Sequence, residues 1–215
     1  MGYTRAMKIP TAPESPAEPL FLGGHPALDF LNTLFGPDDR QVETIGSGRA
    51  FLDWLVAASL LDETVSARLP RRFGEEALDG AAAEARKFRE WARTWLMRWR
   101  AAPHRDYSSE LSALNKMLAR ESCHREVVAA GEGLKVTARP RLEQANALVA
   151  LVAGPIAALV TEERATLVRS CAGANCSLWF LDRTKSHRRL FCSAAVCGNR
   201  AKVQAFRVRA SQSGD

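Results

Sequence analysis

The residues best suited to chemistry are four cysteines in the last fifth of the sequence. They form two C-x4-C pairs with fifteen residues between the pairs. The four are Cys171, Cys176, Cys192 and Cys197. Zn²⁺ prefers four soft ligands in a tetrahedron, and two closely spaced cysteine pairs supply them. Because four thiolates leave no coordination position open, we predict one structural zinc ion rather than a catalytic one.

Two other interpretations of these cysteines are open, namely two disulfides or four unrelated buried thiols. The sequence shows no hydrophobic region typical of a signal peptide, so we expect a cytoplasmic location. A reducing cytosol disfavours disulfides, and zinc is therefore the preferred interpretation. The core that so short a segment can build does not stabilise itself, so its folding should depend on the metal.

The segment between the two cysteine pairs is expected to form a hairpin. Trp179–Leu181 make the first arm, Arg183–His187 the turn, and Leu190–Phe191 the second arm. From Val196 the pattern is helical, so the last pair should lie at the start of a helix. These elements predict a small treble-clef-like zinc module over residues 167–210.

The excess positive charge of the chain lies in the same segment. Residues 170–215 hold eight basic and two acidic residues, and their net charge of +6 equals that of the whole chain. Such an asymmetry favours a polyanionic partner such as DNA, the alternative being a basic tail that aids solubility. The side chains expected to contact DNA are Arg183, Lys185, Arg188, Arg189, Asn199, Arg200 and Lys202.

Two stretches resemble known families. The run Cys197-Gly198-Asn199-Arg200, preceded by LWFLDRTKSHRRLFC, resembles the CGNR zinc finger. The stretch GGHPALDFLNTL, residues 23–34, resembles the start of the ABATE-type domain that precedes this finger and is named for stress-induced transcription regulation. The resemblance implies a bacterial DNA-binding regulator with a sensing or interaction domain upstream.

The rest of the chain predicts a mainly helical body over residues 21–166, after a flexible, proline-rich leader over residues 1–20. Helical patterns cover residues 48–58, 62–69, 75–100, 109–120, 141–160 and 162–167. Residues 125–139 read as a β-hairpin around Gly131-Glu132-Gly133. The fold class is therefore α+β, mainly α, with one hairpin in the body and a C-terminal zinc module. Cys123, just before the hairpin, is expected to be a small buried hydrophobe.

The most apolar run, residues 145–160, reads as a buried core helix with a kink. It is short and is interrupted by Gly154-Pro155, so we expect no transmembrane segment and no membrane partner.

A polar set near the start of the body has two open interpretations. Asp29, Asn32 and Thr33 share one face of a predicted helix, and His25 precedes it. Together they could bind a small effector of unknown identity. They could equally fix the chain through buried hydrogen bonds, or anchor a basic side chain such as Arg200.

The sequence therefore favours a zinc-dependent DNA-binding regulator. The alternative is a zinc-stabilised module that binds another protein without contacting nucleic acid. An enzyme is not expected, because the four histidines are scattered and no paired-carboxylate motif or phosphate-binding glycine loop occurs. A homodimer would be usual for a regulator that reads a two-fold site, although no heptad seam is visible.

Overall fold

The computed structural model describes residues 19–37 and 39–212, so the predicted leader lies outside the described residues except for its last two. The helices are α1 Pro26–Leu31, α2 Gly48–Ala57, α3 Glu63–Ser66, α4 Leu69–Phe73, α5 Glu75–Ala101, α6 Ser108–Leu118, α7 Ala150–Glu162 and α8 Asn199–Gln212. Shorter turns are η1 Ala145–Val149, η2 Ala165–Leu167 and η3 Ala194–Gly198. The strands are β1 Leu34–Phe35, β2 Val42–Glu43, β3 Cys123–Ala130, β4 Gly133–Pro140, β5 Val168–Ser170 and β6 Trp179–Leu181.

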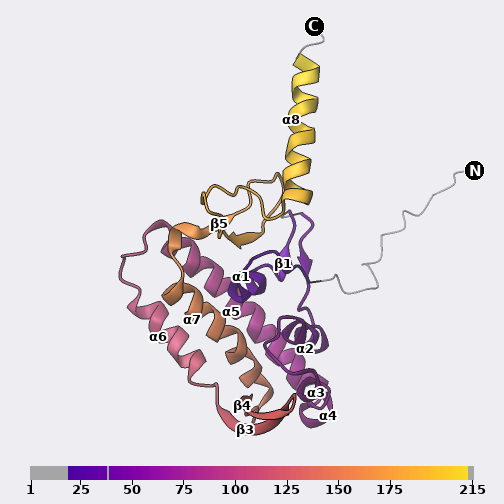
Figure 1. Cartoon of the computed structure of the whole chain (residues 1–215), viewed down its shortest axis with the longest axis vertical. Helices are drawn as coiled ribbons and strands as arrows, with labels where there is room; N and C mark the ends of the chain where they lie inside the picture. Colours follow the sequence, from indigo (N-terminus) through magenta and orange to yellow (C-terminus); the bar gives the residue numbers. More distant parts are fainter. Residues whose placement is uncertain (1–18, 38, 213–215) are drawn as a thin grey trace, which may run out of the picture.

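The predicted fold class is confirmed: the chain is mainly α, with small antiparallel hairpins and a C-terminal cluster of four cysteines. Figure 1 shows the helical body with hairpin β3–β4 at one end and the zinc module at the other, from which α8 projects. Within the described residues the strands pair as β1–β2, β3–β4 and β5–β6. The short β1–β2 pairing was not predicted from the sequence.

Helix α5 is the longest element and carries most of the body core. Its observed bounds agree with the predicted helix over residues 75–100 to within one residue. Trp95 and Trp99 are buried on it, and Trp95 lies 5.4 Å from the Trp91 ring centroid. Trp91, Trp95 and Trp99, spaced four residues apart on one side of α5, therefore pack into or against the body core.

Three arginines of α5 hold the segment that follows α1. Arg89 is only 2% exposed and pairs with both carboxylate oxygens of Glu43, at 2.9 and 2.7 Å. It also donates to the Thr33 hydroxyl at 2.8 Å. Arg86 and Arg93 donate to main-chain carbonyls of the same segment. A buried guanidinium needs such partners, and the result is that α1 is fixed against the body.

Helix α7 with its preceding turn η1 occupies the middle of the body. The predicted helix over residues 141–160 begins four residues later, and Pro155 lies inside it without ending it. By length and composition the span Ala145–Glu162 could cross a membrane, contrary to the sequence interpretation. Half of it is buried in the fold, and it packs against α1, α5 and α6, as a core helix does. The helix predicted over 162–167 is only the turn η2.

Hairpin β3–β4 turns one face away from the body. Arg139 on the other face pairs with Asp62 at 2.9 Å and with Glu126 at 3.3 Å. Because strand residues alternate between faces, Cys123 shares the outer face with Val127. Cys123 is exposed, and the expectation that it is a buried hydrophobe is wrong.

Candidate metal centre

The first cysteine pair closes the turn between β5 and β6. These strands pair antiparallel, with Val168 opposite Leu181 and Ser170 opposite Trp179. The turn is tightened by the Cys176 N–H, which donates to the Gly173 carbonyl at 3.1 Å. Asn175 takes a left-handed φ of 61°, a conformation that asparagine tolerates better than most residues.

The predicted hairpin between the two pairs is wrong in its second arm. Trp179–Leu181 is a strand, but it pairs with β5, which precedes the first cysteine. Leu190 and Phe191 lie outside regular structure, and the contact of this segment with the first turn is an Ala172 N–H bond to the Leu190 carbonyl at 2.8 Å. The first cysteine pair itself supplies the hairpin turn, so the intervening residues are free to form an irregular loop.

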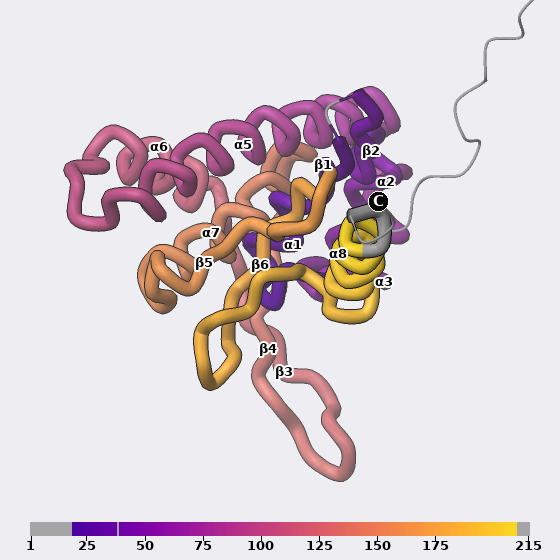
Figure 2. Tube along the Cα trace, turned by 90° about the horizontal axis from the view of Figure 1, so that it is seen from above, coloured from indigo at the N-terminus to yellow at the C-terminus, as the bar shows by residue number. Residues whose placement is uncertain are grey.

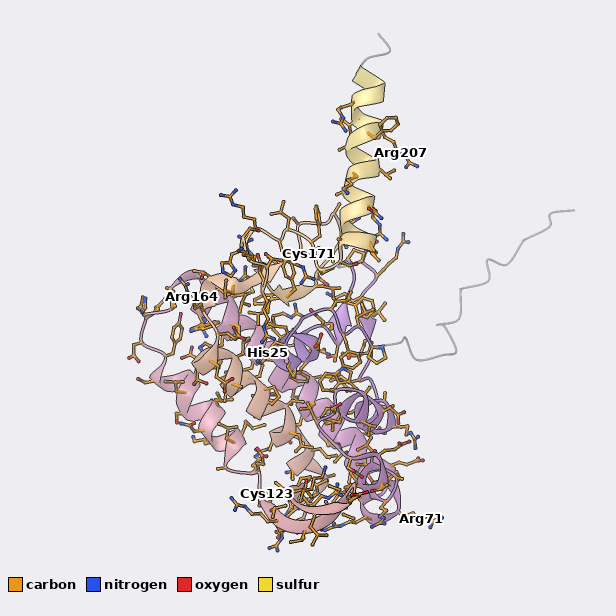
Figure 3. The ribbon with its side chains drawn as sticks, in the orientation of Figure 1. His25, Arg71, Cys123, Arg164, Cys171 and Arg207 are labelled. Carbon is orange, nitrogen blue, oxygen red and sulfur yellow. The ribbon has the colours of Figure 1, made fainter. Side chains whose placement is uncertain are left out.

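The second pair lies on the helical end of the chain, as predicted. Ser193 caps the π-helical turn η3 by accepting the Val196 N–H at 3.2 Å, and α8 continues from the last residue of η3. Cys192 and Cys197 are buried at this point. The metal ligands therefore join the foot of α8 to the β5–β6 turn, as Figure 3 shows around Cys171.

The four sulfur atoms fit one tetrahedral zinc ion. All four lie within 4.8 Å of one another, and Cys192 Sγ lies 3.7 Å from Cys176 Sγ and 3.6 Å from Cys197 Sγ. A zinc–sulfur bond of about 2.3 Å implies sulfurs about 3.8 Å apart in a tetrahedron. Four cysteines and no other side chain make up the cluster within the described residues, so the ion they hold is structural.

Hydrogen bonds within the protein favour the thiolate of Cys171 but not those of Cys176 and Cys192. Burial opposes ionisation of Cys171, but N–H groups of Cys192 and Gly173, at 3.3 and 3.4 Å, lower its pKa. Burial raises the pKa of Cys176 to about 11, and burial raises that of Cys192 as well. The charge that keeps all four sulfurs ionised must therefore come from the metal, and metal binding releases protons.

Gly173 is the position where the metal loop has least room. A Cβ added there would lie 3.3 Å from Cys197 Sγ and 3.4 Å from Cys171 Sγ. Since zinc-bound sulfurs cannot move aside, we expect Gly173→Ala to speed zinc loss to a chelator severalfold. Gly198→Ala is the matched control, because its Cβ would meet neighbours only at 3.7 Å or more. Equal zinc release from both variants, followed with a colorimetric chelator, would contradict this account.

Strand β6 is buried on both faces, which explains its run of large apolar residues. Trp179 and Leu181 belong to the body core, whereas Leu178 and Phe180 pack with Cys192 and Cys197. Alternation along a strand directs neighbours to opposite faces. Trp179 and Phe180 are therefore both core residues, but they belong to two different cores.

Asp182 holds the basic loop, residues 183–189, in place through hydrogen bonds. The sequence analysis did not identify this residue. Its buried carboxylate accepts the Thr184 N–H and hydroxyl at 3.1 and 2.6 Å and the Arg189 N–H at 2.9 Å. Burial opposes ionisation, yet these hydrogen bonds and the Arg169 charge lower the pKa of Asp182. The sequence feature that could have identified it is its position as a single acidic residue at the start of a strongly basic stretch.

The predicted DNA-contacting residues fall into two groups. Arg189 is used inside the module: its guanidinium lies 4.4 Å from the Phe180 ring centroid and donates to the carbonyls of Phe191 and Cys192. Arg183 pairs with Glu163 at 2.7 Å. The remaining predicted residues are exposed on the loop and on α8, namely Lys185, Arg188, Asn199, Arg200 and Lys202.

The polar set around α1 is brought together, and its hydrogen bonds run to the protein. Asn32 is 1% exposed. Its side-chain amide makes two hydrogen bonds to the main chain of Trp179, donating to the carbonyl and accepting the N–H, each at 2.8 Å. Asp29 accepts the Gly23 N–H at 2.7 Å, and the Gly23 carbonyl accepts the Leu181 N–H at 2.7 Å. The α1 segment is therefore hydrogen-bonded to β6 at Trp179 and at Leu181, and we call this set of bonds the clasp between α1 and β6.

His25 and Thr33 complete this arrangement. The His25 ring caps α1 by accepting the Ala27 N–H at 3.2 Å, and burial lowers its pKa. Thr33 donates to the Phe30 carbonyl at 2.7 Å. Arg200 lies exposed on α8 and is not the group that Asp29 or Asn32 holds. Effector binding at these four residues stays a prediction.

Two family models match the chain, one after the other. Residues 24–163 match the ABATE family model, described as "Putative stress-induced transcription regulator". Residues 168–210 match the CGNR zinc finger. The two resemblances stated from the sequence are thereby confirmed, in the predicted order. A search of curated proteins finds no match for the chain.

Proposed function

This chain belongs to the ABATE family and carries a CGNR zinc finger after that domain, and from this premise we propose that it is a zinc-dependent DNA-binding transcription regulator. In this proposal the body is a sensing or interaction domain over residues 21–166, and the zinc module, residues 167–210, contacts the duplex. Zinc has no catalytic part, and the protein is not an enzyme.

The observation that carries the proposal is a set of cations without acidic partners. Among residues 19–37 and 39–212, no ion pair involves Lys185, Arg188, Arg200, Lys202 or Arg207. The body also holds cations outside these ion pairs, such as Arg71 and Lys87, but residues 1–169 carry 22 basic and 22 acidic residues, whereas residues 170–215 carry eight and two. Unpaired cations grouped on one module attract phosphates, and neutralised phosphates release counterions.

The shape of α8 supports the same proposal. It has 14 residues, which corresponds to about 21 Å, and it projects from the molecule (Figure 1). A helix of this kind can enter the major groove of B-DNA. Arg200 and Arg207 are two turns apart on one side of α8, and Lys202 lies on another side. Asn199 is suited to adenine and arginine to guanine.

A second candidate function is supported by apolar residues on the same helix. Val203 is 49% exposed and Phe206 is 67% exposed, and they are neighbours at i and i+3. An exposed apolar pair flanked by cations also fits an acidic protein partner, or a second copy of this chain in a homodimer. We rank it below DNA because eight basic residues against two acidic ones over residues 170–215 favour a polyanion.

The test is fluorescence anisotropy of zinc-loaded protein with random duplex DNA across a salt series. The slope of log K against log salt is negative for a protein that binds phosphates. We expect Arg200→Ala with Arg207→Ala to reduce the magnitude of this slope by about 1.8, because each phosphate contact contributes about 0.9. The matched control is Arg71→Ala with Lys87→Ala, which removes the same charge from exposed sites of the body. Figure 3 shows Arg71 at the end far from the zinc module.

Three outcomes decide the matter. A loss confined to the α8 variant supports DNA binding by the zinc module. An equal loss in the control assigns binding to net charge alone. Zinc-loaded, folded protein that ignores duplex DNA at low salt overturns the proposal and leaves the protein-partner function.

A further inference from the structure

A hollow of about 570 Å³ lies where the body meets the zinc module. Its walls come from the last turns of α5, from η2 and from the start of β5. Figure 2 shows β5 and β6 lying across the body helices at this junction. The polar side chains that line it are Arg100, Thr166 and Arg169. Sites for small ligands occur preferentially at such domain junctions.

Arg100 is the unusual member of this set. Its guanidinium lies 4.6 Å from the Trp179 ring centroid, and the residue is only partly exposed. Within the described residues no hydrogen bond or ion pair involves this guanidinium, in contrast to Arg89 and Arg98 of the same helix. Stacking on an aromatic face leaves the N–H groups at the guanidinium edge available to a ligand.

Arg169 brings a second guanidinium to the same hollow. Within the described part of the chain, the Arg169 guanidinium bonds only through Nη1, to Asp182 Oδ2 at 3.4 Å and to the His187 and Arg189 carbonyls at 3.1 Å each. Its Nε and Nη2 atoms remain as donors. Burial, and then the charge of Arg169, lower the pKa of Arg100, so the two cations disfavour one another. Both remain charged, because a guanidinium is not deprotonated in proteins.

We propose that this hollow binds a phosphate group through Arg100, Arg169 and Thr166. A phosphate monoester carries a charge of about −1.5 to −2 at pH 7, which matches two guanidiniums better than a single carboxylate does. Guanidinium groups bind phosphate oxygens in a bidentate manner, and the Thr166 hydroxyl adds a further donor. A small phosphorylated molecule or a nucleic-acid backbone can supply this phosphate.

The position of the hollow gives such a ligand influence over the zinc module. Arg100 stacks on Trp179, and the main chain of Trp179 is the part of β6 that Asn32 clasps. Arg169 also supports the basic loop through Asp182. A phosphate bound between the two arginines would therefore contact α5 of the body and β5 of the zinc module, and Arg169 of β5 in turn donates to loop carbonyls at His187 and Arg189. This inference does not depend on DNA binding by α8.

The experiment is isothermal titration of the zinc-loaded full chain with inorganic phosphate at constant ionic strength in a buffer without phosphate. We expect saturable binding that Arg100→Gln weakens by about tenfold to a hundredfold, the range for a lost charge-assisted hydrogen-bond pair. Arg98→Gln is the matched control, since Arg98 pairs with Glu110 at 2.7 Å and does not line the hollow. Thr166→Ala, at an exposed residue, tests the site without disturbing the Trp179 stacking.

Phosphate titration and DNA binding, measured on the same variants, distinguish the two sources of phosphate. Phosphate binding lost in Arg100→Gln, with duplex affinity unchanged, identifies a small-molecule site, and this result stands even if the wild type ignores DNA. A DNA salt slope lowered by about 0.9 in Arg100→Gln, without binding of inorganic phosphate, identifies a backbone phosphate. If Arg100→Gln and Thr166→Ala behave like Arg98→Gln towards both ligands, the proposal is overturned.

Discussion

Cys192→Ser is expected to abolish zinc binding and to unfold the zinc module while the body stays folded. Cys192 is 2% exposed and its sulfur lies at the centre of the ligand cluster, 3.7 and 3.6 Å from two partner sulfurs. A serine hydroxyl in this place is a poor zinc ligand. Structural zinc contributes an apparent binding free energy of about 10–16 kcal/mol at pH 7, which exceeds what so small a module can replace.

The structure explains why the damage should be local. The core around the ligands consists of Leu178, Phe180, Cys192 and Cys197, whereas Val168, Trp179 and Leu181 belong to the large body core and should keep β5 and β6 against the body when the cysteine loops unfold. Zinc content should fall from one ion per chain to none, measured by a colorimetric assay on unfolded protein. Far-ultraviolet circular dichroism should retain the signal of α5 and α7, because their packing does not involve the metal.

Cys123→Ser is the control for this prediction. Cys123 is exposed at the start of β3, and Figure 3 shows it at the opposite end of the molecule from Cys171. Its substitution should leave the zinc content unchanged. A Cys192→Ser protein that still holds one zinc ion with a native melting temperature would refute the four-cysteine site.

Asn32→Ala is expected to lower the free energy of unfolding by about 2–6 kcal/mol, because it leaves the Trp179 N–H and carbonyl buried without partners, at about 1–3 kcal/mol for each orphaned group. Both bonds span 147 residues of sequence and measure 2.8 Å. Zinc content should be unchanged, since Asn32 touches no ligand. Hydrogen exchange should accelerate at the amides of β6 more than at those of α5.

Asn115→Ala is the matched control, since Asn115 lies exposed on α6. Its free energy of unfolding should stay within about 0.5 kcal/mol of the wild-type value, as is usual for surface substitutions. Urea unfolding of the three proteins gives the comparison. If Asn32→Ala and Asn115→Ala unfold at the same midpoint, the clasp between α1 and β6 contributes nothing to stability.

Local patterns in the sequence were sufficient for the metal site and the long helices. The spacing of the cysteines determined the four ligands, because a zinc ion needs short turns between paired sulfurs. The period of apolar residues determined α5, and Ser47 and Asp62 cap α2 and α3 as their residue types suggest. The resemblance at GGHPALDFLNTL and CGNR added the family, which the comparisons confirm.

The same local reasoning failed where a residue's partner lies far along the chain. Arg89 reads as one more surface arginine, yet it is buried against Glu43 and Thr33. Arg189 is a different case, because its partners Phe180 and Phe191 lie close in sequence, and its contact with DNA stays a prediction. Nothing in the spacing of charged residues distinguishes an arginine that has found a carboxylate or carbonyl from one that faces solvent.

The sequence by itself determined that this protein holds one structural zinc ion, carries its excess positive charge on the zinc module, and is mainly helical. Those features depend on ligand spacing, composition and helical period, which are all properties of neighbouring residues. Tertiary structure alone decided that β6 pairs with β5, that Asn32 clasps β6, and that Arg100 and Arg169 meet in one hollow. These depend on which segments the hydrophobic core brings together, and hydrogen-bond partners follow only after that packing is complete.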